Sequence, residues 1–497
     1  MKKSRAALAL LAVGASLLVA VAGSAAASCA PADHAGGEWR SYGQDLTNAR
    51  NQSSETEIGP DTVASLSTTY AFSVSRNAGA GAINSTPVVA DGCLFVGTSL
   101  GSVFAANADT GETVWSTRLT RVEGLPAGAN IMSPSVVDGR VHVIGNLGKP
   151  FAAALDQATG KVLWQTDMIE KDAGLFDAAS SVVANGLVFF ATTWGDVVDP
   201  TSRPPFYILD ATNGAVLKKT YVIPMEDGLQ GYSGGGIWST AAVDTETNYL
   251  YAGTANPYSR RLEHKYTNAL IKVDFDRTRS TFGEIVASYR GDSDANPALV
   301  NTPQCQLLGD IPLAGYGFFC GQQDIDFGAS PQLFTDSTGR KLIGDLQKSG
   351  VYHVADAETM APVWKARLAP FYRVGGHSAT AAFDDHAIYV NTDEGKLDAL
   401  DKDTGARLWT ASYKDPGGKY QPVSVANGVV YVSHKNGSLH AFDAQTGQEL
   451  FTTAPEIDGA TCSGTSAAGI AIARNTVYFG CDSGSDRAGM VFALRVS

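Results

Sequence analysis

The sequence predicts an all-β protein, an eight-bladed β-propeller of four-stranded antiparallel blades whose ring is closed by an N-terminal strand. Three observations lead to this prediction. A turn element recurs along the chain, each copy follows two short β-rich runs, and the last unit lacks one strand that an isolated N-terminal run can supply. Apolar residues make up 44% of the 497 residues, which is enough for a large packed core.

The recurring element has the pattern Ala-x-Asp-x-x-Thr-Gly-x-x-x-Trp. An Asp side chain can accept backbone N–H bonds and Gly can adopt a positive φ, so the element is expected to form a tight turn. The Trp recurs at a fixed place and is expected to pack between blades. Copies of decreasing regularity span residues 154–164, 399–409, 441–451, 105–115, 355–364, 209–214 and 273–274.

A β-hairpin is expected before each turn element, because two β-rich runs flank an Asp-Gly or Asn-Gly pair. These pairs are Asp91-Gly92, Asp138-Gly139, Asn185-Gly186 and Asn427-Gly428. Hairpin and turn together give four antiparallel strands in about 40 to 50 residues, the length of a propeller blade. Eight units are predicted to start near Pro87, Pro134, Ser180, Ser239, Ser330, Ser378, Pro422 and Gly464.

The last unit ends at Phe492–Ser497 without a Thr-Gly turn or a fourth strand. The run Leu66–Val74 is an isolated strand with Tyr70 in the place of a Trp. We expect this run to complete the last blade, because ring closure removes exposed sheet edges. The predicted organisation is a signal peptide at 1–27, an N-terminal extension at 28–65 and the propeller at 66–497.

Residues 1–27 have the features of a secretory signal peptide. Lys2, Lys3 and Arg5 precede an apolar run from Ala6 to Ala22, and a small-residue cleavage site follows. The prediction is a secreted, extracellular protein with no membrane span after removal of the signal. A retained membrane anchor and a lipoprotein attached through Cys29 are the alternatives.

The net charge of −13 falls to −16 when the three basic residues of the signal peptide are removed. An acidic chain repels phosphate backbones, so no nucleic-acid partner is expected.

The six cysteines suit an oxidising compartment. Two pairs of cysteines that are close in sequence could each close a short loop, and the remaining two cysteines could then bond to each other. The sequence does not decide this, because six cysteines allow 15 connectivities. The chain has no Cys-x-x-Cys-His motif, so no covalent haem is expected. The pairs in question are Cys462 and Cys481, Cys305 and Cys320, and Cys29 and Cys93.

The turn element resembles the tryptophan-docking motif of dehydrogenases that use pyrroloquinoline quinone (PQQ). Longer stretches resemble the polyvinyl-alcohol-dehydrogenase-like branch of these quinoproteins, and the resemblance extends from about residue 39 to the end. The most specific stretch is Asp-Ile-Asp-Phe-Gly-Ala-Ser-Pro at 324–331 together with Gln-Lys-Ser-Gly at 347–350. Further matches are Trp-Arg-Ser-Tyr-Gly-Gln-Asp at 39–45 and the stretch 236–256. His377-Ser378 stands where this branch often has Trp-Gly.

The resemblance implies a site on the propeller axis that holds PQQ and Ca²⁺. Trp238 would be the stacking platform and Lys348 would bond the quinone oxygens. Asp326 or Asp324 would be the general base, and Asn256 and Asp196 would ligate Ca²⁺, which prefers hard oxygen ligands. The implied reaction oxidises a small-molecule or polymeric alcohol, and without a haem domain the electrons pass to a separate acceptor.

Each candidate residue also has a purely structural interpretation. The two aspartates could solvate a loop, and Lys348 could lie on the surface. The alternative function is a non-enzymatic secreted propeller that acts as a binding or scaffold module, because a fold does not imply an activity. The two hypotheses differ in whether the candidate residues, which come from different units, meet around one axial cavity.

Overall fold

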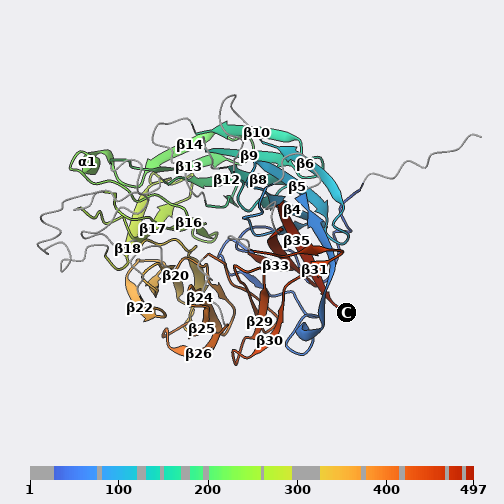
Figure 1. The fold of residues 1–497 in the computed structure, drawn as a ribbon. Helices are drawn as coiled ribbons and strands as arrows, with labels where there is room; N and C mark the ends of the chain where they lie inside the picture. Colours follow the sequence, from blue (N-terminus) through green and yellow to red (C-terminus); the bar gives the residue numbers. More distant parts are fainter. Residues whose placement is uncertain are drawn as a thin grey trace, which may run out of the picture.

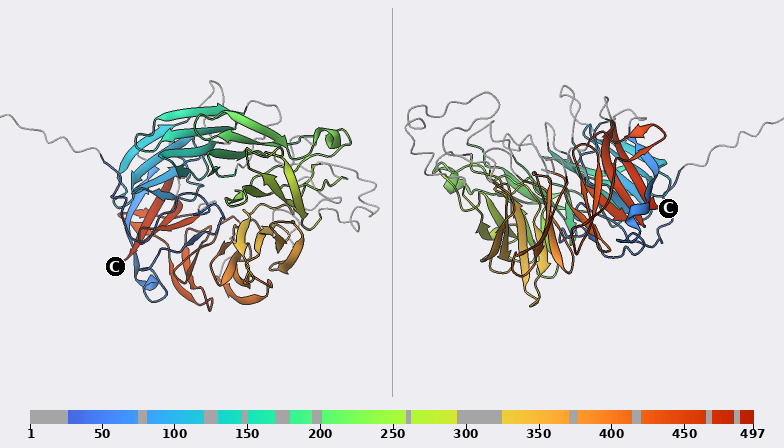
Figure 2. Two further views of the ribbon diagram at one scale, coloured as in Figure 1. Left: turned by 180° about the vertical axis from the view of Figure 1, so that it is seen from behind. Right: turned by 60° about the horizontal axis from the view of Figure 1, so that its bottom comes forward.

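A computed structural model of the chain describes residues 27–74, 81–119, 130–145, 150–168, 179–193, 201–258, 262–293, 325–370, 377–413, 420–464, 469–483 and 488–497. The predicted signal peptide, apart from its last residue, lies outside this part of the chain. Eight sheets of at least four strands follow one another around a common axis (Figure 1), which confirms the predicted eight-bladed propeller. A second view shows the same ring from behind (Figure 2).

Blades 1 to 4 follow the order of the chain, and each has its first strand nearest the axis. Blade 1 contains β3 (Val88–Ala90), β4 (Cys93–Gly97), β5 (Ser102–Asn107) and β6 (Thr113–Arg118). Blade 2 contains β7 (Ser135–Val137), β8 (Arg140–Gly145), β9 (Phe151–Asp156) and β10 (Val162–Asp167). Blade 3 contains β11 (Val182–Ala184), β12 (Leu187–Ala191), β13 (Pro205–Asp210) and β14 (Val216–Tyr221). Blade 4 contains β15 (Ala242–Asp244), β16 (Tyr249–Gly253), β17 (Ala269–Asp274) and β18 (Ile285–Arg290).

Blades 5 to 7 repeat this arrangement. Blade 5 contains β19 (Gln332–Thr335), β20 (Lys341–Gln347), β21 (Val351–Asp356) and β22 (Pro362–Arg367). Blade 6 contains β23 (Ala382–Phe383), β24 (Ala387–Thr392), β25 (Lys396–Asp401) and β26 (Arg407–Ser412). Blade 7 contains β27 (Ser424–Ala426), β28 (Val429–Ser433), β29 (Leu439–Asp443) and β30 (Glu449–Thr453), with β1 (Asn51–Gln52) added to its inner edge.

Blade 8 joins the two ends of the propeller and closes the ring. Its strands are β33 (Ile470–Ala473), β34 (Thr476–Ser483), β35 (Ala488–Val496) and β2 (Leu66–Ser73), and β2 pairs antiparallel with β35. The N-terminal strand therefore supplies the fourth strand, as the sequence predicts. The smaller elements are α1 (Met225–Gly228), the 3-10 turn η1 (Val63–Ser65), β31 (Glu456–Ile457) and β32 (Ala460–Thr461).

The predicted turns have the backbone geometry that their sequences require. In the first hairpin, Asp91 has a φ of 48° and Gly92 a φ of 76°, as expected for a type I′ turn. In the second blade, Asp156 Oδ1 accepts a hydrogen bond from the backbone N–H of Thr159 at 2.9 Å, and Gly160 has a φ of 70°. Both turn types are therefore determined by local sequence.

The repeated tryptophans pack between neighbouring blades, as predicted. Trp115 of blade 1 donates from Nε1 to the Gln157 carbonyl oxygen of blade 2 at 2.9 Å, and its ring lies against Gly160. Tyr70 plays this role at the ring closure, donating its hydroxyl to the Ala108 carbonyl oxygen at 2.7 Å. The apolar core consists of similar clusters between adjacent blades.

The N-terminal extension contributes a segment that lies inside the ring, here called the inner segment (residues 36–52). Carbonyl oxygens of the inner segment accept hydrogen bonds from backbone N–H groups of innermost strands in six blades. The donors are Val89, Val136, Val243, Leu333, Phe383 and Val425, at donor–acceptor distances of 2.7 to 3.0 Å. The segment therefore links blades that are distant in sequence.

Two disulfides lie in the described part of the chain. Cys29 bonds to Cys93 with a Cα–Cα distance of 4.8 Å, and Cys462 bonds to Cys481 at 5.7 Å. Cys305 and Cys320 lie outside the described residues. Within the described residues, no helix is long and apolar enough to cross a membrane.

Candidate active site

Three of the predicted site residues, from three different loops, form one contact cluster. The Trp238 Nε1–H donates to Asp326 Oδ2 at 2.9 Å, and Lys348 Nζ lies 2.7 Å from Asp326 Oδ1. The same ammonium group lies 4.9 Å from the centroid of the Trp238 ring. Asp326 is 2% and Lys348 7% exposed, so the structure places neither on the surface.

Lys348 is held in position by the turn between β20 and β21. Its backbone N–H donates to the Asp326 carbonyl oxygen at 3.0 Å, and Gly350 N–H donates to the Gln347 carbonyl oxygen at 2.9 Å. The Gln347 side chain bonds in turn to the backbone of Asp292. The turn therefore fixes the lysine against the aspartate through main-chain as well as side-chain contacts.

Trp238 packs edge-on against a glycine that leaves room for its ring. A Cβ atom at Gly328 would lie 2.2 Å from Cη2 and Cζ2 of Trp238, far inside van der Waals contact. Gly328 lies in the same loop as Asp326, two residues further along the chain. The absence of a side chain at this position therefore lets the indole lie close to the loop that bears the predicted base.

Trp238 also lines a cavity of about 370 Å³ on the propeller axis. The lining residues precede the innermost strands of seven blades, and Tyr42 joins them from the inner segment. The volume lies within the range of roughly 300 to 1,000 Å³ that is usual for small-molecule sites. The lining consists of hydroxyl, amide and aromatic groups, among them Asn84, Asn130, Ser180, Thr240, Ser378 and Tyr420.

Ser and Thr hydroxyls form a hydrogen-bonded chain from blade to blade around this cavity. Ser180 N–H donates to Thr240 Oγ1 at 3.1 Å, Thr240 N–H to Ser330 Oγ at 2.9 Å, and Ser330 N–H to Thr380 Oγ1 at 3.0 Å. The Tyr42 hydroxyl donates to Thr380 Oγ1 at 2.7 Å. This chain gives the cavity a floor built from several blades.

Sequence reasoning missed both the hydroxyl chain and Tyr42. A Ser or Thr stands two residues before the innermost strand in several units, and this regularity could have indicated the chain. Tyr42 lies within a stretch that carries the family resemblance, but the sequence indicated no place for the N-terminal extension relative to the ring. Only the path of the inner segment brings Tyr42 to the axis.

Of the three remaining predicted residues, the structure describes only Asn256. Asn256 is buried, and its loop adjoins the loops that carry Asp326 and Trp238. The Thr254 carbonyl oxygen accepts from the Phe327 N–H, and the Ala255 N–H donates to the Gly236 carbonyl oxygen. Asp196 and Asp324 lie outside the described residues. The described residues include no group of three or more His, Cys, Asp or Glu side chains suited to a metal ion.

A buried carboxyl group lies near this cluster and was not predicted. Asp345 in β20 is fully buried, and burial raises the pKa of its carboxyl group well above the usual value. A Cβ atom at Gly253 would lie 3.0 Å from Asp345 Oδ2 and 2.8 Å from Phe327 Cβ. Burial therefore favours the neutral form of this carboxyl group.

His377 stands next to Ser378 of the cavity and is fully buried. Its Nδ1 accepts a hydrogen bond from the Asp393 backbone N–H at 2.9 Å, and its Nε2 lies 3.3 Å from the Pro370 carbonyl oxygen. Both ring nitrogens thus have backbone partners, and the ring holds the loop before blade 6 in place.

Comparisons with known proteins agree with this architecture. The sequence model of one family, described as outer membrane protein assembly factor BamB, matches residues 39–291 and 347–497. The polyvinylalcohol dehydrogenase of Pseudomonas sp is 27% identical over 379 residues, which cover 71% of this chain and 54% of that protein. That of Sphingopyxis sp. (strain 113P3) is 28% identical over 375 residues, which cover 66% and 53%.

The chain spans about half the length of these curated relatives. The crystal structure of quinohemoprotein alcohol dehydrogenase from Comamonas testosteroni matches with a TM-score of 0.71 at 18% identity, covering 92% of this chain and 80% of that one. It therefore shares the fold. The chain belongs to the PQQ-repeat β-propeller family that this sequence model represents, and its relatives place it with the PQQ-dependent dehydrogenases, or quinoproteins.

Proposed function

We propose that this protein is an exported oxidoreductase that oxidises an alcohol with PQQ and Ca²⁺. The observation that supports this most strongly is the contact of Asp326 and Lys348 with Trp238, which itself lines the axial cavity. A structural lysine or a solvated aspartate would not require burial of both groups against a tryptophan at the axis. A small-molecule or polymeric alcohol is the proposed substrate class, and electrons would pass to a separate acceptor.

The residues of the cavity fit a flat, oxygen-rich cofactor such as PQQ. The Trp238 indole offers an aromatic face, and the buried hydroxyls of Ser180 and Ser378 have no hydrogen-bond partner among the described residues. Buried hydroxyls without partners are costly, so acceptor oxygens of a ligand would satisfy them. Lys348 adds a cation over the indole ring, with Nζ 4.9 Å from its centroid.

The residues available for Ca²⁺ are oxygen donors, which this ion prefers. Asn256 would offer its amide oxygen, and Asp196 and the Asp326 carboxylate would complete the protein ligands. Held by these residues, PQQ would supply a hydride acceptor for the alcohol and Ca²⁺ would supply a Lewis acid.

The protein side of the reaction is proton removal from the alcohol hydroxyl. Asp326 is the proposed general base, because its carboxylate is fixed beside the cavity by the Trp238 Nε1–H. The ammonium group of Lys348 stabilises the carboxylate anion by its charge.

Export is supported by the two disulfides, because such bonds persist in oxidising compartments. The signal peptide proposed for residues 1–27 would direct this export. The test is N-terminal sequencing of protein recovered from the culture medium, which should begin near Ser28. Recovery of the full-length chain inside cells only would contradict export.

The activity is tested by reconstitution of the purified protein with PQQ and Ca²⁺. We expect saturable PQQ binding by titration and alcohol-dependent dye reduction, which Asp326→Asn should reduce by at least 10²-fold. Asp244→Asn is the matched control, because Asp244 also pairs with a lysine, Lys341 at 2.8 Å, but lies away from the axial cavity. It should leave turnover unchanged.

The rival proposal is a non-enzymatic binding module, which the description of the matching family as an assembly factor favours. Absence of PQQ binding by the intact protein would support this rival and contradict the dehydrogenase proposal. If the protein binds PQQ and the turnover of Asp326→Asn is unchanged, the dehydrogenase proposal stands but Asp326 is not the general base.

A further inference from the structure

The contact between the inner segment and the innermost strands is interrupted at blade 3. The second residue of the innermost strand donates its backbone N–H to the inner segment in blades 1, 2, 4, 5, 6 and 7. In blade 3 this residue is Val183, and no such bond joins it to the inner segment within the described residues. Blade 8 lacks this bond at Ala471, but the backbone N–H of Arg474, directly after its innermost strand, donates to the Gly36 and Gly37 carbonyl oxygens of the inner segment. Between Arg40 and Leu46 the segment turns away, with Gln44 N–H bonded to the Ser41 carbonyl oxygen at 3.2 Å.

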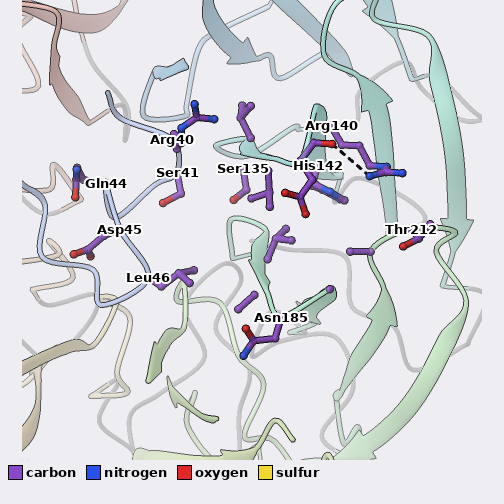
Figure 3. Close-up of a pocket in the computed structure, with 17 residues that line it drawn as sticks. Arg40, Ser41, Gln44, Asp45, Leu46, Ser135, Arg140, His142, Asn185 and Thr212 are labelled. Atoms are coloured by element: carbon purple, nitrogen blue, oxygen red, sulfur yellow. Dashed lines mark hydrogen bonds between the residues drawn. The ribbon is translucent and has the colours of Figure 1, made fainter. Parts of the chain in front are cut away.

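A cavity of about 400 Å³ occupies this interruption, here called the blade-3 cavity. Figure 3 shows Gln44 and Asp45 of the inner segment on one side and Arg140 and His142 of blade 2 on the other. Its walls come from residues within and after the innermost strands of blades 2 and 3. The axial cavity is lined instead by residues that precede those strands, so the two cavities are separate.

Arg140 supplies an uncompensated positive charge to the blade-3 cavity. Its Nη1 reaches only the Asp138 carbonyl oxygen, at 3.4 Å, and within the described residues it forms no ion pair with a carboxylate. Arg40 differs, because it pairs with Glu38 at 2.6 Å and Asp91 at 2.7 Å. Of the two arginines that line the cavity, Arg140 is therefore the one available to a ligand.

Besides the two arginines, the ionisable residues of the lining are His142, Asp45 and Asp138, and none of them forms an ion pair with Arg140 within the described residues. Burial, followed by the charge of Arg140, lowers the pKa of His142 to about 4, so the imidazole is neutral at pH 7. Asp45 Oδ1 already accepts hydrogen bonds from the backbone N–H groups of Thr47 and Ala49. The lining thus contains two donors, the Arg140 guanidinium and the Val183 N–H, that have no carboxylate or inner-segment partner within the described residues.

The rest of the lining combines the polar side chains of Ser41, Gln44, Ser135, Asn185 and Thr212 with a set of aliphatic side chains. Leu46 of the inner segment faces the cavity together with small aliphatic side chains of blades 2 and 3. These side chains are Val136, Val137, Val183, Ala184 and Ala211. A ligand with a short hydrocarbon chain would bury apolar surface here, at about 25 cal/mol per Å².

We propose that the blade-3 cavity binds a small carboxylate that carries a short aliphatic chain. The carboxylate pairs with the Arg140 guanidinium and accepts the Val183 N–H, in the place that a carbonyl oxygen of the inner segment takes in six other blades. The aliphatic chain lies against the valine and alanine wall. This site is independent of the proposed dehydrogenase activity, because it shares no lining residue with the axial cavity.

Sodium butyrate is the probe, titrated calorimetrically into the purified full-length protein at pH 7. We expect saturable binding at one site. Arg140→Gln should weaken this binding by about 10-fold or more, because a hydrogen bond to a charged group is lost. Arg118→Gln is the matched control, since Arg118 is an exposed arginine of blade 1 outside the cavity, and it should bind butyrate as the parent protein does.

A second variant keeps Arg140 and fills the space. Ser41→Phe places a ring in the cavity from the inner segment and should abolish butyrate binding. Butyramide, which has the same shape without the charge, should bind at least 10-fold more weakly than butyrate. Absence of saturable butyrate binding by the parent protein, equal binding of butyramide, or unchanged affinity in Arg140→Gln would each overturn the proposal.

Discussion

Lys348 Nζ lies 2.7 Å from Asp326 Oδ1, and both side chains are almost completely buried beside the Trp238 ring. A buried ion pair is costly to form but more costly to break, because removal of one partner leaves an uncompensated charge in a poorly solvated place. The pair therefore links the proposed catalytic group to the stability of blade 5.

The first prediction concerns this pair. Lys348→Met should lower the free energy of unfolding by about 3 kcal/mol, and the double variant Lys348→Met/Asp326→Asn should recover part of that loss. Chemical denaturation at pH 7 measures both values. Lys396→Met is the control, because its pair with Glu394 is more exposed and should cost no more than about 1 kcal/mol. Similar losses in Lys348→Met and Lys396→Met would contradict the prediction.

The second prediction concerns the close approach of Gly328 to Trp238. Gly328→Ala should displace the indole, because the added Cβ would lie 2.2 Å from its ring atoms. PQQ affinity should fall by at least 10-fold if Trp238 is the stacking platform, while the far-ultraviolet circular dichroism stays unchanged. In Gly464→Ala the added Cβ meets only the Lys435 carbonyl oxygen, at 3.3 Å, so PQQ affinity should not change. Unchanged PQQ affinity in Gly328→Ala would rule out the platform role.

The third prediction concerns the closure of the ring between blades 8 and 1. Asp109 bonds to the buried Arg474 at 3.0 Å and to Arg495 at 2.9 Å. Partial burial opposes ionisation, but the hydrogen bonds and charges of the two arginines outweigh it and lower the pKa of Asp109. A lowered pKa in the folded state stabilises the protein above the unfolded value of about 3.9, and this stabilisation is lost as the pH falls through the folded-state pKa.

Asp109→Asn should therefore lower the free energy of unfolding at pH 7 by roughly 1 to 3 kcal/mol. The difference from the parent protein should shrink as the pH falls below about 4. Denaturation series at pH 3, 4, 5 and 7 measure this. A difference that does not vary with pH would show that the charge of Asp109 does not contribute to ring closure.

The fourth prediction concerns Arg50, a fully buried arginine that fixes the inner segment to blades 7 and 8. Its Nε donates to the Val423 carbonyl oxygen at 2.6 Å and its Nη2 to the Ile470 carbonyl oxygen at 3.1 Å. Arg50→Lys should lower the free energy of unfolding by about 2 to 3 kcal/mol, because a single ammonium group cannot replace the forked donors. Urea denaturation provides the measurement.

Arg118→Lys serves as the surface control for Arg50→Lys, and it should change stability by less than about 0.5 kcal/mol. If the two lysine variants unfold at the same urea concentration, the inner segment does not depend on Arg50.

Much of the fold could be predicted from the sequence because its units are defined by local chemistry. An Asp-Gly or Asn-Gly hairpin and an Asp-x-x-Thr-Gly turn each determine their backbone geometry within a few residues. The incomplete last unit and the isolated strand Leu66–Val74 predicted ring closure, because each blade needs four strands. The resemblance to quinoproteins further indicated Trp238, Asp326 and Lys348, which the structure brings together.

The tertiary structure alone decided what meets at the axis. Arg50 bonds to Ile470 across 420 positions of sequence, and Tyr42 reaches Thr380 across 338. No local pattern encodes such contacts, because they depend on how eight blades close around the inner segment. The buried pairing of Lys348 with Asp326, the chain of hydroxyls and the interruption at Val183 arise in the same way. The sequence by itself determined the repeating blade, whereas the closed ring determined which side chains and backbone groups face its centre.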